Sequence, residues 1–340
     1  MPRTFRLVAC AALWASSIPG LAPGVSAQAP DSGAVLYTAW CARCHGVDAR
    51  GTPAASVRTE VPPADLAACA VSSAEPEDLW VDIVTQGGAE FGLSLDMPAY
   101  GDAGTAEQIR LVVRYVRSLC RERGWPPGEL NFPRAFLTEK AYPENELIVV
   151  AEGRGQELIY ERRVGRRLQF EAAVSTVFDS LDRPFDHATA AVKYNVWHSL
   201  ERRALASVGL EASPPLGRRD RWELEPFVAI GFERPDFIVQ GEALAVWEET
   251  EGIAGGSLRL GVGRETGRFV PMVEAGWDWA RGSPGVLTLY PQTWIRLSRL
   301  GHVAGSVGAG IPVNGPDRGQ VTLTAFLLWD FGDGPLFRGW

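Results

Sequence analysis

The apolar residues of this chain recur with two different periods, and the change between them divides the sequence in two. In residues 28–123 they return at helical spacing, whereas in residues 147–340 they alternate with polar residues, as strands require. The helical period is clearest at Ile109, Val112, Val113 and Val116, and the alternating period at Trp222, Leu224, Val228, Ile230 and Phe232. We therefore predict a multidomain protein, with an all-α domain followed by an all-β antiparallel domain.

The second half contains about ten to twelve alternating segments separated by turn signals. A soluble sandwich and a membrane barrel share this pattern, because the apolar face can meet either a core or lipid. Strands of similar length in simple succession favour an outer-membrane barrel, as does an aromatic-rich last strand shortly before Trp340. Tryptophans in or at the ends of strands are expected at the membrane interfaces, namely Trp197, Trp222, Trp247, Trp277, Trp279, Trp294 and Trp329.

The N-terminus has the layout of a secretory signal peptide. Arg3 and Arg6 precede an apolar stretch at 7–18, and small residues lead up to Ala27. We expect residues 1–27 to be removed and the mature chain to be exported. The formal net charge of −8 argues against a nucleic-acid partner, which would require a basic surface.

Cys41 and Cys44 precede His45 in a C-x-x-C-H sequence, the attachment signature of c-type haem. Two thiols at this spacing on a helical turn can reach both vinyl groups of one porphyrin, and the next residue then places an imidazole beneath the iron. A zinc half-site and a thioredoxin-like redox pair share the shorter Cys-x-x-Cys pattern. Zinc requires a second pair of ligands, whereas Cys69 and Cys120 stand alone. The motif therefore favours haem.

Helices around this motif resemble those of the class I c-type cytochrome domain over residues 31–121. Gly33 and Tyr37 share a face of the expected first helix, where the family carries a small residue and an aromatic. We expect a middle helix at 75–86 and a last helix at 105–120, capped by Thr105.

The resemblance also implies the haem ligands. Cys41 and Cys44 would bind one haem c covalently, His45 would be the proximal iron ligand and Met97 the distal one. Pro53 stands where the family places a proline whose carbonyl holds the imidazole proton. With both axial positions filled, the resemblance implies an electron carrier and not an enzyme.

The remaining cysteines flank the middle and last helices of this domain. Cys69 lies before the middle helix and Cys120 ends the last one, so they are candidates for a disulfide. Two separate buried thiols are the alternative, since pairing does not follow from sequence.

Residues 124–146 form a proline-rich linker between the domains. Its aromatic residues, including Phe132 and Tyr142, indicate that it packs against something and does not swing free. Beyond it, residues 194–200 and 206–211 resemble transporter-like outer-membrane barrels that are sometimes fused to cytochromes.

These observations predict electron transfer by a haem domain that its own barrel anchors to the outer membrane, with the haem on the periplasmic side. Redox proteins and outer-membrane lipid are the expected partners. Two alternatives stay open. A transport protein could use the haem domain as a plug, docking module or redox gate, and a haem peroxidase would need an open sixth iron site.

Overall fold

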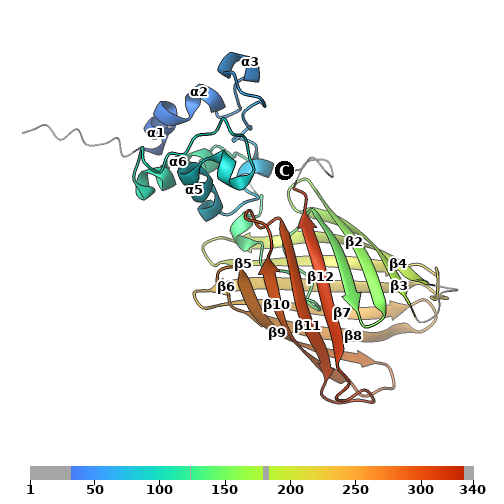
Figure 1. Ribbon diagram of the computed structural model, residues 1–340. Coiled ribbons are helices and arrows are strands. Elements are labelled where there is room, and N and C mark those ends of the chain that lie inside the picture. The colour runs from blue at the N-terminus through green and yellow to red at the C-terminus, as the bar shows by residue number, and fades with distance from the viewer. Residues whose placement is uncertain (1–31, 123, 179–183, 333–340) are drawn as a thin grey trace, which may run out of the picture.

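The computed structural model describes residues 32–122, 124–178 and 184–332, which form a helical domain beside one end of a β-barrel (Figure 1). The expected signal peptide, residues 1–27, and the C-terminal Trp340 lie outside the described residues. In the described ranges, no helix is both long and apolar enough to cross a membrane.

The helical domain carries its longest helices where the sequence predicts them. Thr105 caps α6 in a capping box with Gln108, and Gly87, at a φ of +85°, ends α5. Helix α5 starts two residues later than predicted, because Pro76 takes the N-cap position. The elements are α1 (Gly33–Trp40), α2 (Ala42–His45), α3 (Ala54–Val57), α4 (Cys69–Ser72), α5 (Glu77–Gln86), η1 (Gly88–Phe91), α6 (Ala106–Ser118) and η2 (Gly128–Leu130).

Helices α1 and α6 cross at close range, and this crossing forms the centre of the domain core. A Cβ at Gly33 would lie 2.2 Å from the backbone oxygen of Leu111, so only glycine permits the approach. The rings of Tyr37 and Tyr115 meet beside it, with centroids 5.4 Å apart. The predicted small and aromatic positions are thus confirmed. Cys69 and Cys120 form a disulfide with 4.9 Å between their Cα atoms, which ties α4 to the end of α6.

The second half is a closed antiparallel barrel of twelve strands, and the sandwich alternative is excluded. Each strand pairs with its neighbours in sequence, and β1 closes the barrel against β12, with Glu146 opposite Asp330. The strands are β1 (Glu146–Glu152), β2 (Gly155–Val164), β3 (Leu168–Val177), β4 (Phe185–Ser199), β5 (Ala204–Ser213), β6 (Glu223–Arg234), β7 (Phe237–Glu248), β8 (Gly252–Gly263), β9 (Phe269–Ala280), β10 (Val286–Arg296), β11 (Val303–Pro312) and β12 (Thr322–Asp330).

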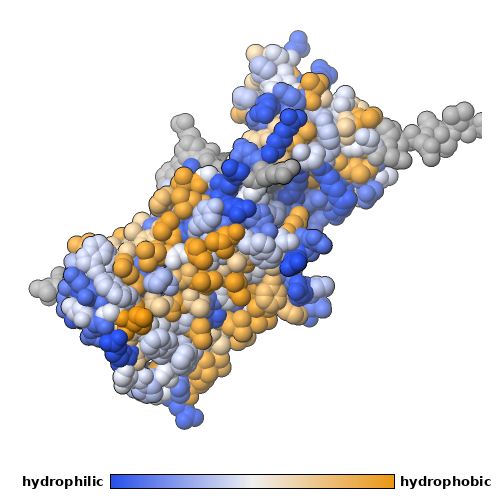
Figure 2. Space-filling model, turned by 180° about the vertical axis from the view of Figure 1, so that it is seen from behind, coloured by the Kyte–Doolittle hydropathy of each residue, from blue (hydrophilic) through white to orange (hydrophobic). Residues whose placement is uncertain are grey.

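The outer face of the barrel is apolar, as Figure 2 shows. On β8, for example, Leu258 and Leu260 are 54% and 52% exposed. Large aliphatic side chains in this number on a water-exposed surface would be costly, whereas lipid accepts them. The barrel is therefore of the outer-membrane type. Most of the predicted interfacial tryptophans point outward, including Trp197, Trp222 and Trp277.

Trp294 was expected at the membrane interface, and this expectation is wrong. Its side chain is 8% exposed and packs inside the barrel with Ile148, Met272 and Phe326. The alternation on β10 places Tyr290, Gln292 and Trp294 on the inner face. The sequence does not show which face of β10 points inward, because both faces of this strand carry large apolar residues.

Candidate functional site

Helix α2 places the three residues of the C-x-x-C-H motif on a single helical turn. The backbone N–H groups of Cys44 and His45 both donate to the carbonyl of Cys41, at 3.1 and 2.9 Å. Both thiols are free and partly exposed. Burial, followed by the neighbouring Cys44, raises the pKa of the Cys41 thiol to about 11. A redox-active cysteine pair works through a thiolate of lowered pKa, so Cys41 lacks the property that this alternative requires.

The imidazole of His45 is oriented by the carbonyl of Ala64, which lies 3.3 Å from Nδ1. The family resemblance implied that the Pro53 carbonyl would make this contact, but in the structure that carbonyl accepts a hydrogen bond from the N–H of Ser56. The carbonyl that orients the imidazole therefore belongs to Ala64 and not to Pro53, but it is a backbone carbonyl, as expected. Burial lowers the pKa of His45, and the hydrogen bond to Ala64 opposes this only in part. The ring is therefore neutral at pH 7, as an iron ligand must be.

Ala64 reaches His45 because the chain after α3 folds back over the motif. The N–H groups of Leu66 and Ala67 donate to the carbonyl of Ala49, at 2.7 and 3.3 Å. Gly51 adopts a φ of +83°, and a Cβ there would lie 2.4 Å from the Pro63 carbonyl oxygen. This close return brings residues 63–66 against the turn after α2.

Met97 lies in a loop that is tied to α5 by backbone hydrogen bonds. Its carbonyl accepts from the N–H of Gly88 at 3.0 Å, and Tyr100 N–H donates to Val84 at 3.0 Å. The Tyr100 hydroxyl also donates to the carbonyl of Trp40, the residue before Cys41, at 2.6 Å. These contacts hold the loop close to the end of α1.

Trp40 and Trp80 connect the two sides of this site. Both pack against the cluster that includes Cys41 and against the cluster that includes Met97. Trp80 Nε1 and Thr59 Oγ1 are buried polar atoms without a hydrogen-bond partner among the described residues. Two thiols, an imidazole and a thioether are the donor set of a c-type haem, and these residues fit that group.

Residues 28–116 match the family described as "Cytochrome C oxidase, cbb3-type, subunit III". They form a cytochrome c domain. Membership implies covalently bound haem c, in agreement with the arrangement of Cys41, Cys44 and His45 on α2. None of the curated proteins compared with the chain matches it.

Among solved structures, similar folds are found for outer-membrane channels. The KdgM porin is 10% identical with a TM-score of 0.43, and the alignment covers 55% of this chain and 99% of the porin. An outer membrane channel from Pseudomonas putida F1 is 10% identical with a TM-score of 0.43, over 59% of this chain and 100% of the channel. The NanC porin is 8% identical with a TM-score of 0.41, over 54% and 98%.

The segment 131–145, between the cytochrome domain and β1, runs inside the barrel; we call it the plug segment. One wall carboxylate, Glu274 on β9, accepts hydrogen bonds from its backbone at Phe136 (2.7 Å), Leu137 (3.1 Å) and Thr138 (2.9 Å). Glu274 is fully buried. Six further wall residues bond to the segment's backbone, namely Gln169, Lys193, Ser207, Gln240, Glu242 and Arg259.

Ion pairs add to these hydrogen bonds. The two lysines of the chain, Lys140 and Lys193, are both buried here. Lys193 Nζ lies 2.6 Å from Glu139 Oε1, and Lys140 Nζ lies 2.6 Å from Glu144 Oε1. The sequence predicted that the linker packs against another part of the protein, but not that it packs inside the barrel. The one sequence signal for this place is that the only two lysines lie within the linker, at Lys140, and at an expected inward position of a strand, at Lys193.

The cytochrome domain also contacts the mouth of the barrel directly. His302 Nε2 lies 3.3 Å from Glu75 Oε1, and Arg299 pairs with Glu90 at 2.8 Å. Closer to the plug segment, Arg117 on α6 holds Glu129 through both carboxylate oxygens. His302 is thus a contact between the two domains.

Proposed function

We propose that this protein is an electron carrier in which one haem c is bound by Cys41 and Cys44, with His45 as the proximal and Met97 as the distal iron ligand. Bound haem supplies a one-electron Fe(III)/Fe(II) couple. The chain's own part is to orient the imidazole through Ala64 and to hold the methionine loop against α5. With both axial positions taken by side chains, no position is left for a substrate.

The observation that carries this proposal is the shared packing of Trp40 and Trp80. These two side chains bridge the cluster of the Cys41 turn and the cluster of Met97, so the ligands predicted from distant parts of the sequence border one site. A methionine that served only to fill space would not need a loop tied by backbone hydrogen bonds on both sides of it.

We further propose that the barrel anchors the cytochrome domain to the outer membrane and keeps it in the periplasm. The connections at the end of the barrel that faces the cytochrome domain contain at most six residues, whereas two at the opposite end contain nine. Outer-membrane barrels have short periplasmic turns and longer extracellular loops. The plug segment enters from the same end, which agrees with a periplasmic haem.

Optical spectra of the membrane-extracted protein in both oxidation states test the ligand set. The oxidised protein should show the weak far-red methionine-to-iron band, and the reduced protein should show a low-spin c-type spectrum and no rapid carbon monoxide binding. Met97→Ala should lose that band and bind carbon monoxide, while Met272→Leu, a methionine inside the barrel, should change neither. Carbon monoxide binding by the unchanged protein would instead support a haem enzyme.

A channel is the second candidate, because the barrel encloses a cavity beside the plug segment. The hydrogen bonds between that segment and side chains of eight wall strands favour a closed lumen. Planar-bilayer recording tests this: steady conductance of the unchanged protein would support transport, and its absence would support the anchor.

A further inference from the structure

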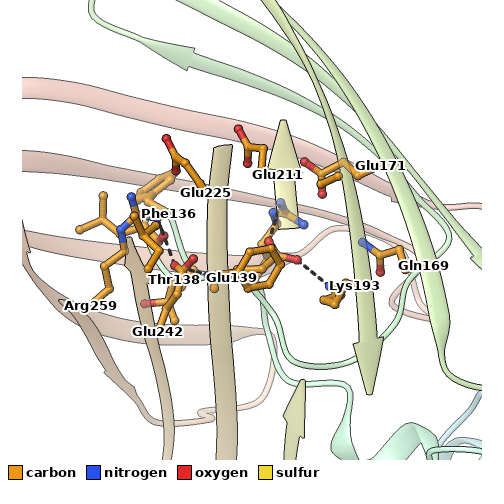
Figure 3. Close-up of a pocket in the computed structure, with 16 residues that line it drawn as sticks. Phe136, Thr138, Glu139, Gln169, Glu171, Lys193, Glu211, Glu225, Glu242 and Arg259 are labelled. Atoms are coloured by element: carbon orange, nitrogen blue, oxygen red, sulfur yellow. Dashed lines mark hydrogen bonds and ion pairs between the residues drawn. The ribbon is translucent and has the colours of Figure 1, made fainter. Parts of the chain in front are cut away.

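The lumen beside the plug segment holds a cavity of about 210 Å³ that is lined by carboxylates (Figure 3). Glu171, Glu211, Glu225 and Glu242 approach it from four different wall strands, and Glu139 approaches it from the plug segment. Arg134, Lys193 and Arg259 also line the cavity, so five carboxylates face three cationic side chains.

Three carboxylates converge at one side of this cavity. One oxygen from each of Glu139, Glu161 and Glu171 lies within 4.8 Å of the others. Glu161 is fully buried; its Oε1 accepts from Arg134 at 2.7 Å, but its Oε2 has no hydrogen-bond partner. A buried carboxylate oxygen without a donor is costly, and it marks a place where a bound cation would be stabilised.

The charges at this place do not balance within the protein. Arg134 pairs with Glu161, and Lys193 pairs with Glu139. Glu171 has no hydrogen bond or ion pair among the described residues, and the same holds for Glu211 on the adjoining wall. Arg259 pairs with Glu242, and Glu225 makes no ion pair among the described residues, so three negative charges remain uncompensated if all six carboxylates are ionised. Either protons or a cation must neutralise them.

We propose that Glu139, Glu161 and Glu171 bind a divalent cation of the calcium type. Carboxylate oxygens are ligands for hard cations, and a bound cation would offset the negative charge that Arg134, Lys193 and Arg259 leave uncompensated. Calcium accepts carboxylate oxygens at about 2.3–2.6 Å in a flexible geometry, whereas Mg²⁺ demands near-ideal octahedral geometry at about 2.0–2.1 Å and retains several waters. Because Glu139 belongs to the plug segment and the other two to the wall, the ion fastens the segment in the lumen.

Isothermal titration with CaCl₂ tests the site on the full-length haem-loaded protein in detergent, after treatment with EDTA. We expect one Ca²⁺ per chain at pH 7, and an at least tenfold higher Kd for Glu171→Gln. This substitution keeps the side-chain shape and breaks no contact of the metal-free protein. Glu249→Gln, in an exposed turn of the barrel, is the matched control and should leave the Kd unchanged.

A second readout is the temperature at which the barrel unfolds on heating in a gel-shift assay. Calcium should raise it for the unchanged protein and for Glu249→Gln, but not for Glu171→Gln, because a ligand stabilises only the state that binds it. Absence of calcium binding would show that protons neutralise the carboxylates and would overturn the proposal. Binding that Glu171→Gln leaves intact would also overturn it. Neither result bears on electron transfer, which the haem spectrum tests separately.

Discussion

The two halves of this protein place their apolar residues on opposite sides. In the cytochrome domain Ile109 and Val112 are 1% and 2% exposed and form the core. In the barrel, the middle strands turn Leu258 and Val228 outward while Glu274 and Lys193 are buried inside. The same physical rule produces both arrangements, since apolar groups avoid water and lipid replaces the core as their partner. The solvent around each half therefore decides which face of an element is the inside.

The largest effect is expected at the haem attachment. Replacing both thiols, in Cys41→Ser together with Cys44→Ser, should abolish covalently bound haem, because the thioether bonds depend on them. Haem staining of a denaturing gel measures this. The barrel should still show heat-modifiable migration, since none of its strands contacts these cysteines. Loss of the barrel as well would show that the two halves fold as one unit.

The second-largest effect is expected when Glu274, the carboxylate that binds the backbone of the plug segment, is removed. Glu274→Ala leaves the N–H groups of Phe136, Leu137 and Thr138 without their acceptor, at about 1–3 kcal/mol for each buried group. We expect a less stable barrel with bursts of conductance in planar bilayers. Equal conductance in the unchanged protein would contradict the closed lumen.

A charge placed on the outer face of the barrel tests whether this surface meets lipid while the surface of the cytochrome domain meets water. Leu258→Arg, in the middle of β8, should destabilise the barrel by about 2–4 kcal/mol if this face meets lipid. The counterpart in the cytochrome domain is Val35→Arg, also exposed, which should stay within about 0.5 kcal/mol because water surrounds it. Urea unfolding in vesicles measures the first and thermal unfolding of the helical signal the second. Equal costs would remove the distinction between the two surfaces.

The smallest effect concerns the junction of the two halves. Burial alone would raise the pKa of Glu129, but the hydrogen bonds and charge of Arg117 outweigh it and hold the pKa below its usual value. The pair therefore stabilises the folded state above the unfolded pKa of about 4.3, and this stability is lost as pH falls through the lower folded pKa. Thermal unfolding from pH 6 to pH 3 should show the loss, and Glu129→Gln should flatten that part of the curve. An unchanged slope in the variant would show that other carboxylates set the acid stability.

Local patterns in the sequence were sufficient to predict the longest helices and the strands. The capping box at Thr105, the glycine stop after α5 and the alternation on β6 and β8 each depend on neighbours a few residues away, so they are readable without the fold. The haem motif is likewise confined to one turn. Some contacts between distant residues were anticipated, such as that of Cys69 with Cys120, but others were not. Pro53 was expected to hold the His45 imidazole, where the structure has Ala64, and Trp294 was expected on the outer face.

A haem-binding helical domain and a barrel-forming half were predictable from the sequence, because both follow from the spacing of residue types along a short stretch. What fills the barrel depends on contacts between distant parts of the chain. A linker rich in proline has no period of its own, and its polar backbone had to be satisfied by Glu274 and other wall residues from strands far along the chain. The cluster of Glu139, Glu161 and Glu171 exists for the same reason, since closing the barrel brings together carboxylates that are distant in sequence.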